Sequence, residues 1–188
     1  DGQKTYIYGK TGKLLGTLPI CGWVSKTDVP GIWACGSLAF NSSLKIVAQE
    51  KGAFYPGLLS AGKLNKKSLY ALPLESGGYV QRWTYVDGSL KRVKAGGYAL
   101  ESTLAGATPV HTFKNGRQVV VAKNSSGKFG VVDTKGNVLI PFSYSDFYDS
   151  GTGDYVMMKK GKSWQFVKVS HLASGKAVKG GVYTVGKL

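Results

Sequence analysis

Residues 127–144 read GKFGVVDTKGNVLIPFSY, and this stretch has the pattern of a β-hairpin. A basic residue leads into the aromatic Phe129, and the apolar run that follows ends at Asp133. A polar turn containing glycine comes next, and a second apolar run ends at Pro141. Short apolar runs on either side of such a turn are typical of antiparallel strands. The stretch therefore predicts a strand, a tight turn and a second strand.

The same order of residues recurs along the chain. Related stretches begin at residues 6, 52, 82 and 161, and they read YIYGKTGKLLGTLP, GAFYPGLLSAGKL, RWTYVDGSLKRV and GKSWQFVKV. Each begins with an aromatic anchor or has one within its first four residues: Tyr6 or Tyr8, Phe54, Trp83, Phe129 and Trp164. A repeat cannot bury its apolar face alone, so we expect these anchors to fill the space between successive hairpins.

The predicted fold is all-β, an array of antiparallel hairpin repeats for which a propeller is one arrangement. Asp87-Gly88 and Asn115-Gly116 are strong hairpin-turn signals, and no segment has a long apolar period of 3.6 residues. We expect a single β-repeat domain over residues 1–188, with a stapled loop between Cys21 and Cys35 near the N-terminus.

The best unit, GKFGVVDTKGNVLIPFSYSDFYD followed by DYVMMKKGKSW, resembles the tryptophan–glycine (WG) repeats of bacterial proteins, whose pattern is K-W-G-y-i-D-k-x-G-k-x-v-i-P. The resemblance is clearest over residues 127–169, where the aromatic–glycine pair is Phe129-Gly130. Degenerate units cover about 79–126, 44–65 and 4–20, and the glycine of the pair is replaced in Trp83-Thr84, Trp164-Gln165 and Phe54-Tyr55. The resemblance implies a repeat scaffold from a bacterium, and it implies no particular activity and no catalytic residues.

The charge of the chain favours anionic partners. There are 25 Lys and Arg residues against 10 Asp and Glu residues, which gives a net charge of +15. Nucleic acid, anionic lipid and acidic cell-wall polymer would all be attracted to such a surface. The alternative is a basic surface without a dedicated site. There is no stretch of about 20 apolar residues, so we expect no transmembrane segment.

The two cysteines predict a disulfide. Cys21 and Cys35 enclose CGWVSKTDVPGIWAC, and bonding them would stabilise the fold by about 3 kcal/mol. The alternative is a pair of reduced, buried thiols. A disulfide implies an oxidising compartment, and a start at Asp1 without an apolar signal core is what a mature exported chain or a trimmed chain would show. We expect an extracellular or cell-surface protein.

The stapled segment also carries the best candidate for ligand binding. Trp23 and Trp33 lie outside the repeat pattern, and a rigid pair of indole rings would suit stacking on sugar rings. Lys26 lies between them and would add affinity for acidic polymers. The alternative is a small satellite core in which both Trp side chains pack on the disulfide.

Candidates for catalysis and metal binding are sparse. No nucleophile–base signature is present, so we expect no enzyme activity, no catalytic residue and no cofactor. The segment SDFYDSGTGD places Asp146, Asp149 and Asp154 within nine residues. A solvated turn explains this cluster, and a Ca²⁺ or sugar contact is the alternative.

These observations predict a non-enzymatic extracytoplasmic binding module that recognises glycan or an anionic cell-envelope polymer. The first alternative is a protein–protein adhesion or assembly module, since repeat surfaces serve this purpose. The second is nucleic-acid binding by the basic surface, for which charge is the only argument.

Overall fold

The computed structural model describes residues 2, 4–76, 79–102, 110–148, 155–168, 172 and 182–185. Over these residues the chain forms antiparallel β-strands and a 3-10 turn, and it contains no α-helix. The predicted all-β class of antiparallel hairpins is confirmed. No helix in these ranges is long and apolar enough to cross a membrane.

The described strands form five antiparallel sheets in chain order. The first sheet pairs β1 (Lys4–Tyr8) with β2 (Leu14–Pro19). The second is a meander of β3 (Val24–Lys26), β4 (Ile32–Cys35), β5 (Leu38–Asn41) and β6 (Ile46–Gln49). The third contains β7 (Leu59–Leu64), β8 (Lys67–Ser76), β9 (Tyr79–Val86) and the short β12 (Glu101–Ser102).

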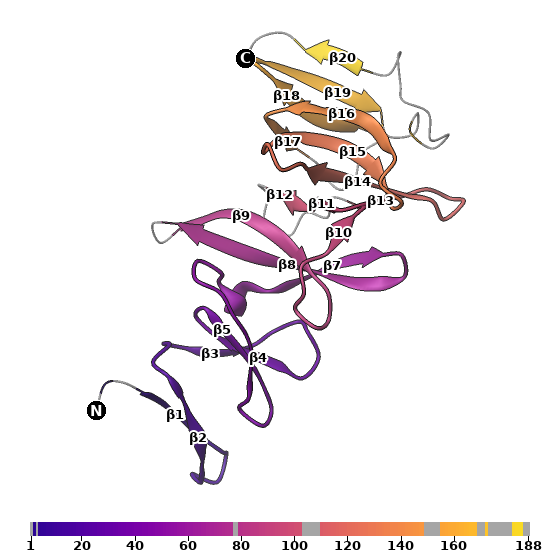
Figure 1. Ribbon diagram of the computed structural model, residues 1–188. Coiled ribbons are helices and arrows are strands. Elements are labelled where there is room, and N and C mark those ends of the chain that lie inside the picture. Colours follow the sequence, from indigo (N-terminus) through magenta and orange to yellow (C-terminus); the bar gives the residue numbers. More distant parts are fainter. Residues whose placement is uncertain are drawn as a thin grey trace.

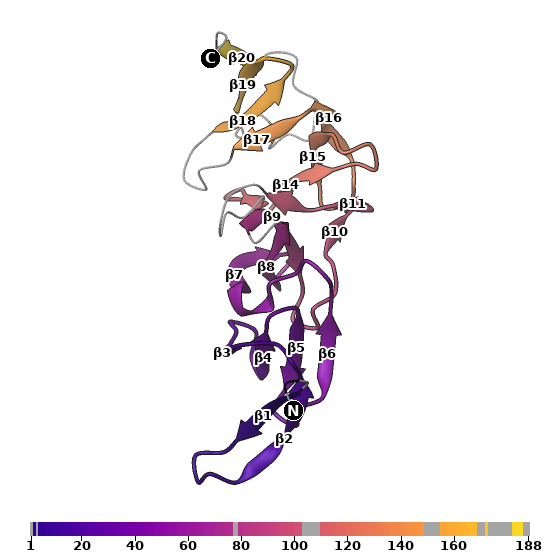
Figure 2. The ribbon, with the colours of Figure 1, turned by 90° about the vertical axis from the view of Figure 1, so that its left-hand side faces the viewer.

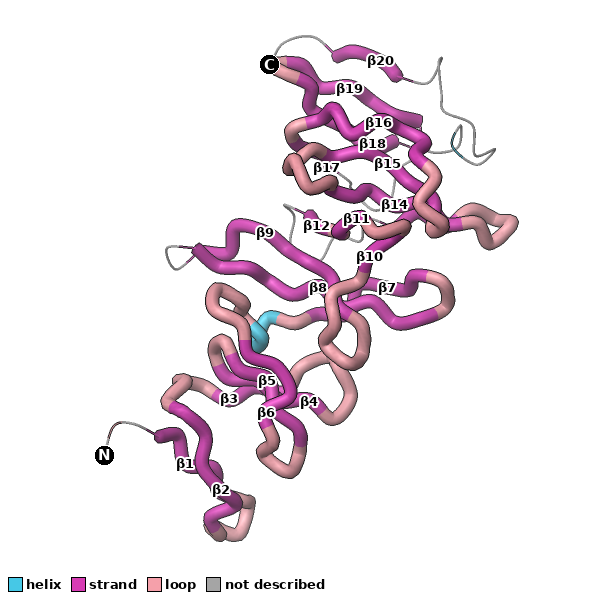
Figure 3. Tube along the Cα trace, viewed as in Figure 1, coloured by secondary structure: helices cyan, strands magenta, loops and turns pink. Residues whose placement is uncertain are grey.

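The two C-terminal sheets continue this plan. The fourth contains β10 (Lys94–Ala95), β11 (Tyr98–Ala99), β13 (Val110–Thr112), β14 (Gln118–Lys123), β15 (Phe129–Asp133) and β16 (Val138–Tyr144). The fifth contains β17 (Asp146–Tyr148), β18 (Tyr155–Lys160), β19 (Ser163–Lys168) and β20 (Val182–Val185). The 3-10 turn η1 (Tyr55–Gly57) lies between β4 and β8 (Figure 3).

The sheets follow one another in a row. Figures 1 and 2 show the first sheet beside the N-terminus and the fifth beside the C-terminus, at opposite ends of an elongated molecule. Among the arrangements that the repeat pattern allows, the described part of the chain therefore adopts an open stack.

Each hydrophobic core lies between two successive sheets. Leu18 of the first sheet packs with Cys35 and Phe40 of the second. The next three cores join the second sheet to the third, the third to the fourth, and the fourth to the fifth. Every sheet is thus held by its neighbours in the stack, as expected for a repeat array.

Strands inside the stack bury both faces because successive side chains point in opposite directions. In β14, Val119 and Val121 belong to the core shared with the fifth sheet. Val120 and Ala122 of the same strand belong to the core shared with the third sheet. This explains the continuous apolar run VVVA, which an exposed strand would not tolerate.

A five-residue turn recurs through the described chain. In residues 9–13, 41–45, 87–91, 113–117, 124–128 and 133–137, the first residue donates its N–H to the fifth carbonyl, and the fourth N–H bonds to the first carbonyl. The fourth residue has positive φ in each. Four of these six turns begin with Asn or Asp, whose side-chain oxygen accepts the N–H of the fifth residue. The turns therefore repeat more regularly than the strands do, and they are three-residue hairpin loops with a bulge.

The predicted core anchors are only partly right. Trp83 and Phe129 are buried in the cores on either side of the fourth sheet. Trp164 is half-buried, with Lys159 Nζ 5.7 Å from its ring centroid. Tyr6 and Tyr8 are 46% and 60% exposed, so that anchor assignment is wrong. They alternate with Ile7, which packs against the first core, and in the described structure the first sheet has a neighbouring sheet on one side only, so both tyrosines stay largely open to solvent.

Candidate ligand-binding site

The predicted disulfide is confirmed, and it ties the first sheet to the second. Cys21 and Cys35 are bonded, with their Cα atoms 5.4 Å apart. Cys35 is buried at the end of β4, and Cys21 follows β2. The backbone N–H of Cys21 donates to Thr5 Oγ1 in β1 at 3.3 Å. The hydrogen bond holds Cys21 on β1, and the disulfide links this end of the β1–β2 hairpin to the second sheet.

The residues predicted to bind a ligand are only partly brought together. Lys26 of β3 lies directly opposite Trp33 of β4 in the antiparallel register. Side chains at opposed positions project from the same face, so the exposed Lys26 and the 39% exposed Trp33 are neighbours. Trp23 precedes β3 and is 91% exposed. The alternative in which both Trp side chains pack on the disulfide is therefore wrong for Trp23.

A hollow of about 290 Å³ opens between the β1–β2 hairpin and the second sheet. Its lining residues are Ile7, Tyr8, Leu15, Trp33, Phe40, Asn41, Ser42 and Leu44. Phe40 is 2% exposed, whereas the rings of Tyr8 and Trp33 are open to solvent. The hollow therefore combines a buried aromatic residue and two solvent-exposed aromatic residues with the amide of Asn41 and the hydroxyl of Ser42. Trp23 is not part of this lining, and its ring does not pair with that of Trp33 in the described structure.

Sequence reasoning missed the contribution of the first hairpin. The repeat pattern predicts a core position for Tyr6 or Tyr8, and it predicts no role for Leu15. The signal that could have placed them is the alternation YIY in residues 6–8. In a two-stranded sheet at one end of a stack, one set of alternating side chains has to face outward or line the edge of the next sheet.

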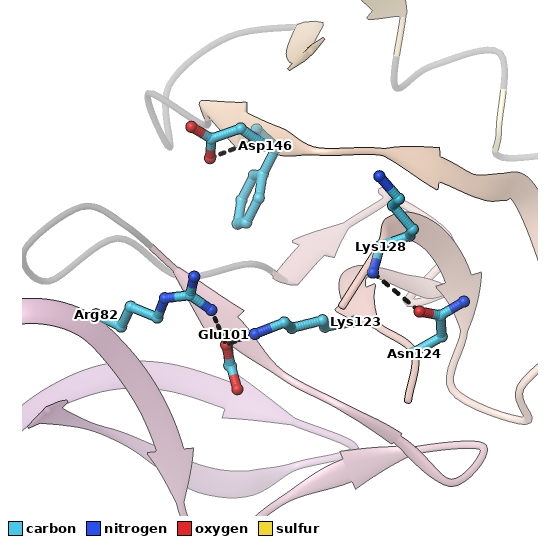
Figure 4. Close-up of polar contacts among 7 residues, drawn as sticks. Arg82, Glu101, Lys123, Asn124, Lys128 and Asp146 are labelled. Atoms are coloured by element: carbon cyan, nitrogen blue, oxygen red, sulfur yellow. Dashed lines mark hydrogen bonds and ion pairs between the residues drawn. The ribbon is translucent and has the colours of Figure 1, made fainter. Parts of the chain in front are cut away.

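The acidic candidates do not form a described metal site. Asp146 is half-buried, and its Oδ1 accepts the backbone N–H of Phe147 at 2.8 Å (Figure 4). Asp149 and Asp154 lie outside the described residues. Within the described ranges, no group of three or more His, Cys, Asp or Glu side chains is placed to hold a metal ion.

A second polar cluster is structural. Glu101 of β12 accepts Lys123 Nζ of β14 at 2.7 Å and lies 3.5 Å from Arg82 Nη1 of β9 (Figure 4). The carboxylate thus joins the third sheet to the fourth. Lys123 also lies 5.8 Å from the centroid of the Phe129 ring. Because each cation is held by this carboxylate, we assign the cluster to sheet stacking and not to ligand binding.

Comparisons with known proteins leave the family open. No protein-family model and no curated protein matches this chain. A solved structure of a protein of unknown function from Bacteroides caccae is 15% identical and covers 98% of this chain and 69% of its own, with a TM-score of 0.27. A TM-score this low carries no argument about fold or function. The resemblance to WG repeats stays a prediction.

Proposed function

We propose that this protein is a non-enzymatic, extracytoplasmic binding module that holds a glycan in the hollow between the β1–β2 hairpin and the second sheet. The observation that carries the proposal is that two solvent-exposed aromatic residues, Tyr8 and Trp33, line one hollow together with apolar side chains. Sugar rings have apolar faces that stack on aromatic rings and hydroxyl edges that need hydrogen-bond partners. Both kinds of partner are present in this hollow.

The size and composition of the hollow support a small saccharide segment. Its volume of about 290 Å³ is at the lower end of the range of about 300–1,000 Å³ for ligand sites. The Asn41 side-chain oxygen already accepts the N–H groups of Ser43 and Lys45, at 3.0 and 3.1 Å. The amide NH₂ group of Asn41 and the hydroxyl of Ser42 are then the groups that a sugar hydroxyl would meet.

The disulfide supports both the affinity and the location. It holds the β1–β2 hairpin on the second sheet, so a ligand would not have to order this half of the hollow on binding. Disulfides persist mainly outside the cytosol, which supports an extracellular or cell-surface location. Lys26, directly opposite Trp33, would favour a glycan that carries acidic groups.

The test is binding to insoluble polysaccharides in a pull-down, followed by calorimetry with soluble fragments of any polysaccharide that is bound. We expect Trp33→Ala and Tyr8→Ala each to abolish detectable binding, because modest affinity depends on one or two stacked rings. Tyr148→Ala is the matched control, because Tyr148 is 42% exposed but belongs to the fifth sheet. The melting curves of all three variants should be close to that of the parent, so that a loss of binding can be separated from a loss of folding. Normal binding by both hollow variants would place the glycan site elsewhere.

Protein–protein adhesion or assembly is the second candidate. It is favoured by exposed large apolar side chains that gather in residues 6–47: Tyr6, Leu14, Ile20, Val24, Ile46 and Val47 besides those named above. Sedimentation of the parent and of Ile20→Ser over a range of concentrations tests self-association. A monomer at all concentrations would exclude assembly of identical copies.

A further inference from the structure

Three adjacent hollows lie at the edge of the stack where turns of the third and fourth sheets meet. Their volumes are about 280, 330 and 580 Å³, and Asn65 lines all three. Their walls come from the β7–β8 turn, the segment after β9, and the turns at 113–117 and 133–137. The β7–β8 turn and the 113–117 turn project on the right in Figure 1. The hollows are separate from the aromatic one near the disulfide.

Positive charge dominates these hollows. Seven Lys or Arg side chains line them, against the carboxylates of Asp87 and Asp133. Five of the seven are exposed lysines that form no ion pair within the described part of the chain: Lys63, Lys66, Lys67, Lys94 and Lys135. These hollows thus gather seven of the 25 Lys and Arg residues, with two of the ten carboxylates, at one place that spans two sheets.

The two carboxylates are committed to their own turns. Asp133 Oδ1 accepts the backbone N–H groups of Lys135 and Asn137, both at 2.9 Å, and Oδ2 lies 3.6 Å from Arg117. Burial raises the pKa of Asp133, but the hydrogen bonds from Asn137 and Lys135 and the charge of Arg117 together hold it below its ordinary value. Asp87 accepts two backbone N–H groups of its turn in the same way, at 2.8 and 3.1 Å. Neither carboxylate pairs with an exposed lysine.

The side-chain amide of Gln118, which lines two of the hollows, joins the fourth sheet to the third. Gln118 Nε2 donates to the Lys63 carbonyl and to Thr112 Oγ1, both at 3.0 Å. Gln118 Oε1 accepts the backbone N–H of Asn65 at 2.6 Å. The basic turn of the third sheet is therefore fixed against the fourth, so the backbone that carries Lys63, Lys66 and Lys67 does not have to be ordered by the ligand.

We propose that these hollows bind a linear anionic polysaccharide. The cations extend over two sheets, and stacked sheets are about 10 Å apart, so an extended polyanion can meet all of them at once. Hydroxyl and amide groups such as Ser68, Thr134 and Asn137 line the same hollows and suit sugar hydroxyls.

The lining argues against nucleic acid as the ligand. Single-stranded nucleic acid is held by stacking on aromatic side chains, and none lines the three hollows. Reading of duplex DNA commonly places a helix in the major groove, and the described chain has no α-helix.

The test measures affinity for heparin, a sulfated polysaccharide, with neutral dextran as the uncharged comparison. One variant carries Lys66→Gln, Lys67→Gln and Lys135→Gln. The control variant carries Lys10→Gln, Lys13→Gln and Lys45→Gln, which removes the same charge from exposed turns near the N-terminus. We expect the first variant to bind heparin about tenfold or more weakly with a shallower salt dependence, the control to change by less than about twofold, and dextran not to bind.

The remaining outcomes overturn the proposal. An equal loss of heparin affinity in both triple variants would mean that heparin is attracted by the net charge of the protein and not by a local site. Duplex or single-stranded DNA bound as tightly as heparin at the same salt, with the same loss in the first variant, would mean that the ligand class is wrong. Absence of heparin binding by the parent would also refute it. Loss of heparin affinity in Trp33→Ala with none in the first variant would place the acidic glycan in the aromatic hollow and refute the basic site, so failure here and failure of the aromatic hollow are distinguishable.

Discussion

Two neighbouring glycines provide a sharp test of how closely the turns of the fourth sheet meet. Gly96 and Gly97 form the turn between β10 and β11, and both have positive φ, +55° and +89°. A Cβ built on Gly96 would overlap with the Cα of Gly136, in the turn between β15 and β16. A Cβ on Gly97 would meet nothing within 4 Å. Comparing alanine at the two positions therefore separates the energetic cost of an unfavourable backbone conformation from the cost of a steric clash.

Conformation alone predicts that Gly97→Ala is at least as harmful as Gly96→Ala. An alanine near φ +55° occupies the left-handed region at a cost of about 1–2 kcal/mol, and φ +89° is no better for it. Contact reverses this order, because two backbones cannot separate by a rotamer change. Overpacking adds about 1–3 kcal/mol, so we expect Gly96→Ala to be the less stable variant by about that amount.

Urea unfolding followed by tryptophan fluorescence measures the two free energies of unfolding. In a chain of this size a difference of about 1 kcal/mol shifts Tm by about 2–4 °C, so thermal melts should show the same order. Gly136→Ala should resemble Gly96→Ala, because its Cβ would lie 2.6 Å from the Gly96 Cα at φ +93°. Equal stability of the Gly96 and Gly97 variants, or the reverse order, would refute the close approach of the two turns.

Three further predictions concern the stack. Trp83→Ala should destabilise by about 3–5 kcal/mol in urea unfolding, and Trp164→Ala by clearly less, because Trp83 is buried and Trp164 is half-buried. Reduction of the Cys21–Cys35 bond should lower stability by up to about 3 kcal/mol, and melts with and without reductant at constant pH check this. The pKa of Asp133 is lower in the folded than in the unfolded chain, so its stabilising contribution is complete above a pH of about 4 and is lost as the pH falls through the folded value. Asp133→Asn should lower the stability above a pH of about 4 and flatten this acid limb of a stability–pH profile, without changing the slope of the profile near neutrality.

The sequence predicted the hairpins and turns better than it predicted which of their side chains are buried. Hairpins, turn positions and the disulfide follow from local patterns, since an Asp or Asn that bonds its own turn does so wherever the hairpin lies. Burial of an aromatic depends on what covers it. Trp83 and Tyr8 have similar places in the repeat, but sheets lie on both sides of Trp83, whereas Tyr8 belongs to the terminal sheet.

The candidate sites could not be predicted for the same reason, because they depend on which parts of the chain lie side by side. Opposition of Lys26 and Trp33 depends on strand register, and the part of Tyr8 in the hollow depends on how the first hairpin leans on the second sheet. The basic hollows depend on packing between sheets that are distant in sequence, as the bond from Asn65 to Gln118 shows. Scattered lysines in the sequence gave no sign that several would meet at one edge.

The two-sided burial of β14 has a consequence for how this chain can change over time. Substitutions within a strand affect one core at a time, but inserting a single residue would exchange the side chains that face the two cores and disturb both at once. Length changes are therefore confined to turns and to the short edge strands. The uneven spacing of the anchors fits this, since the long interval from Trp83 to Phe129 contains β10, β11, β12 and β13, strands of two or three residues. Related proteins would therefore differ in the lengths of their turns and edge strands, where we place the basic hollows, and would keep the lengths of the strands that bury both faces.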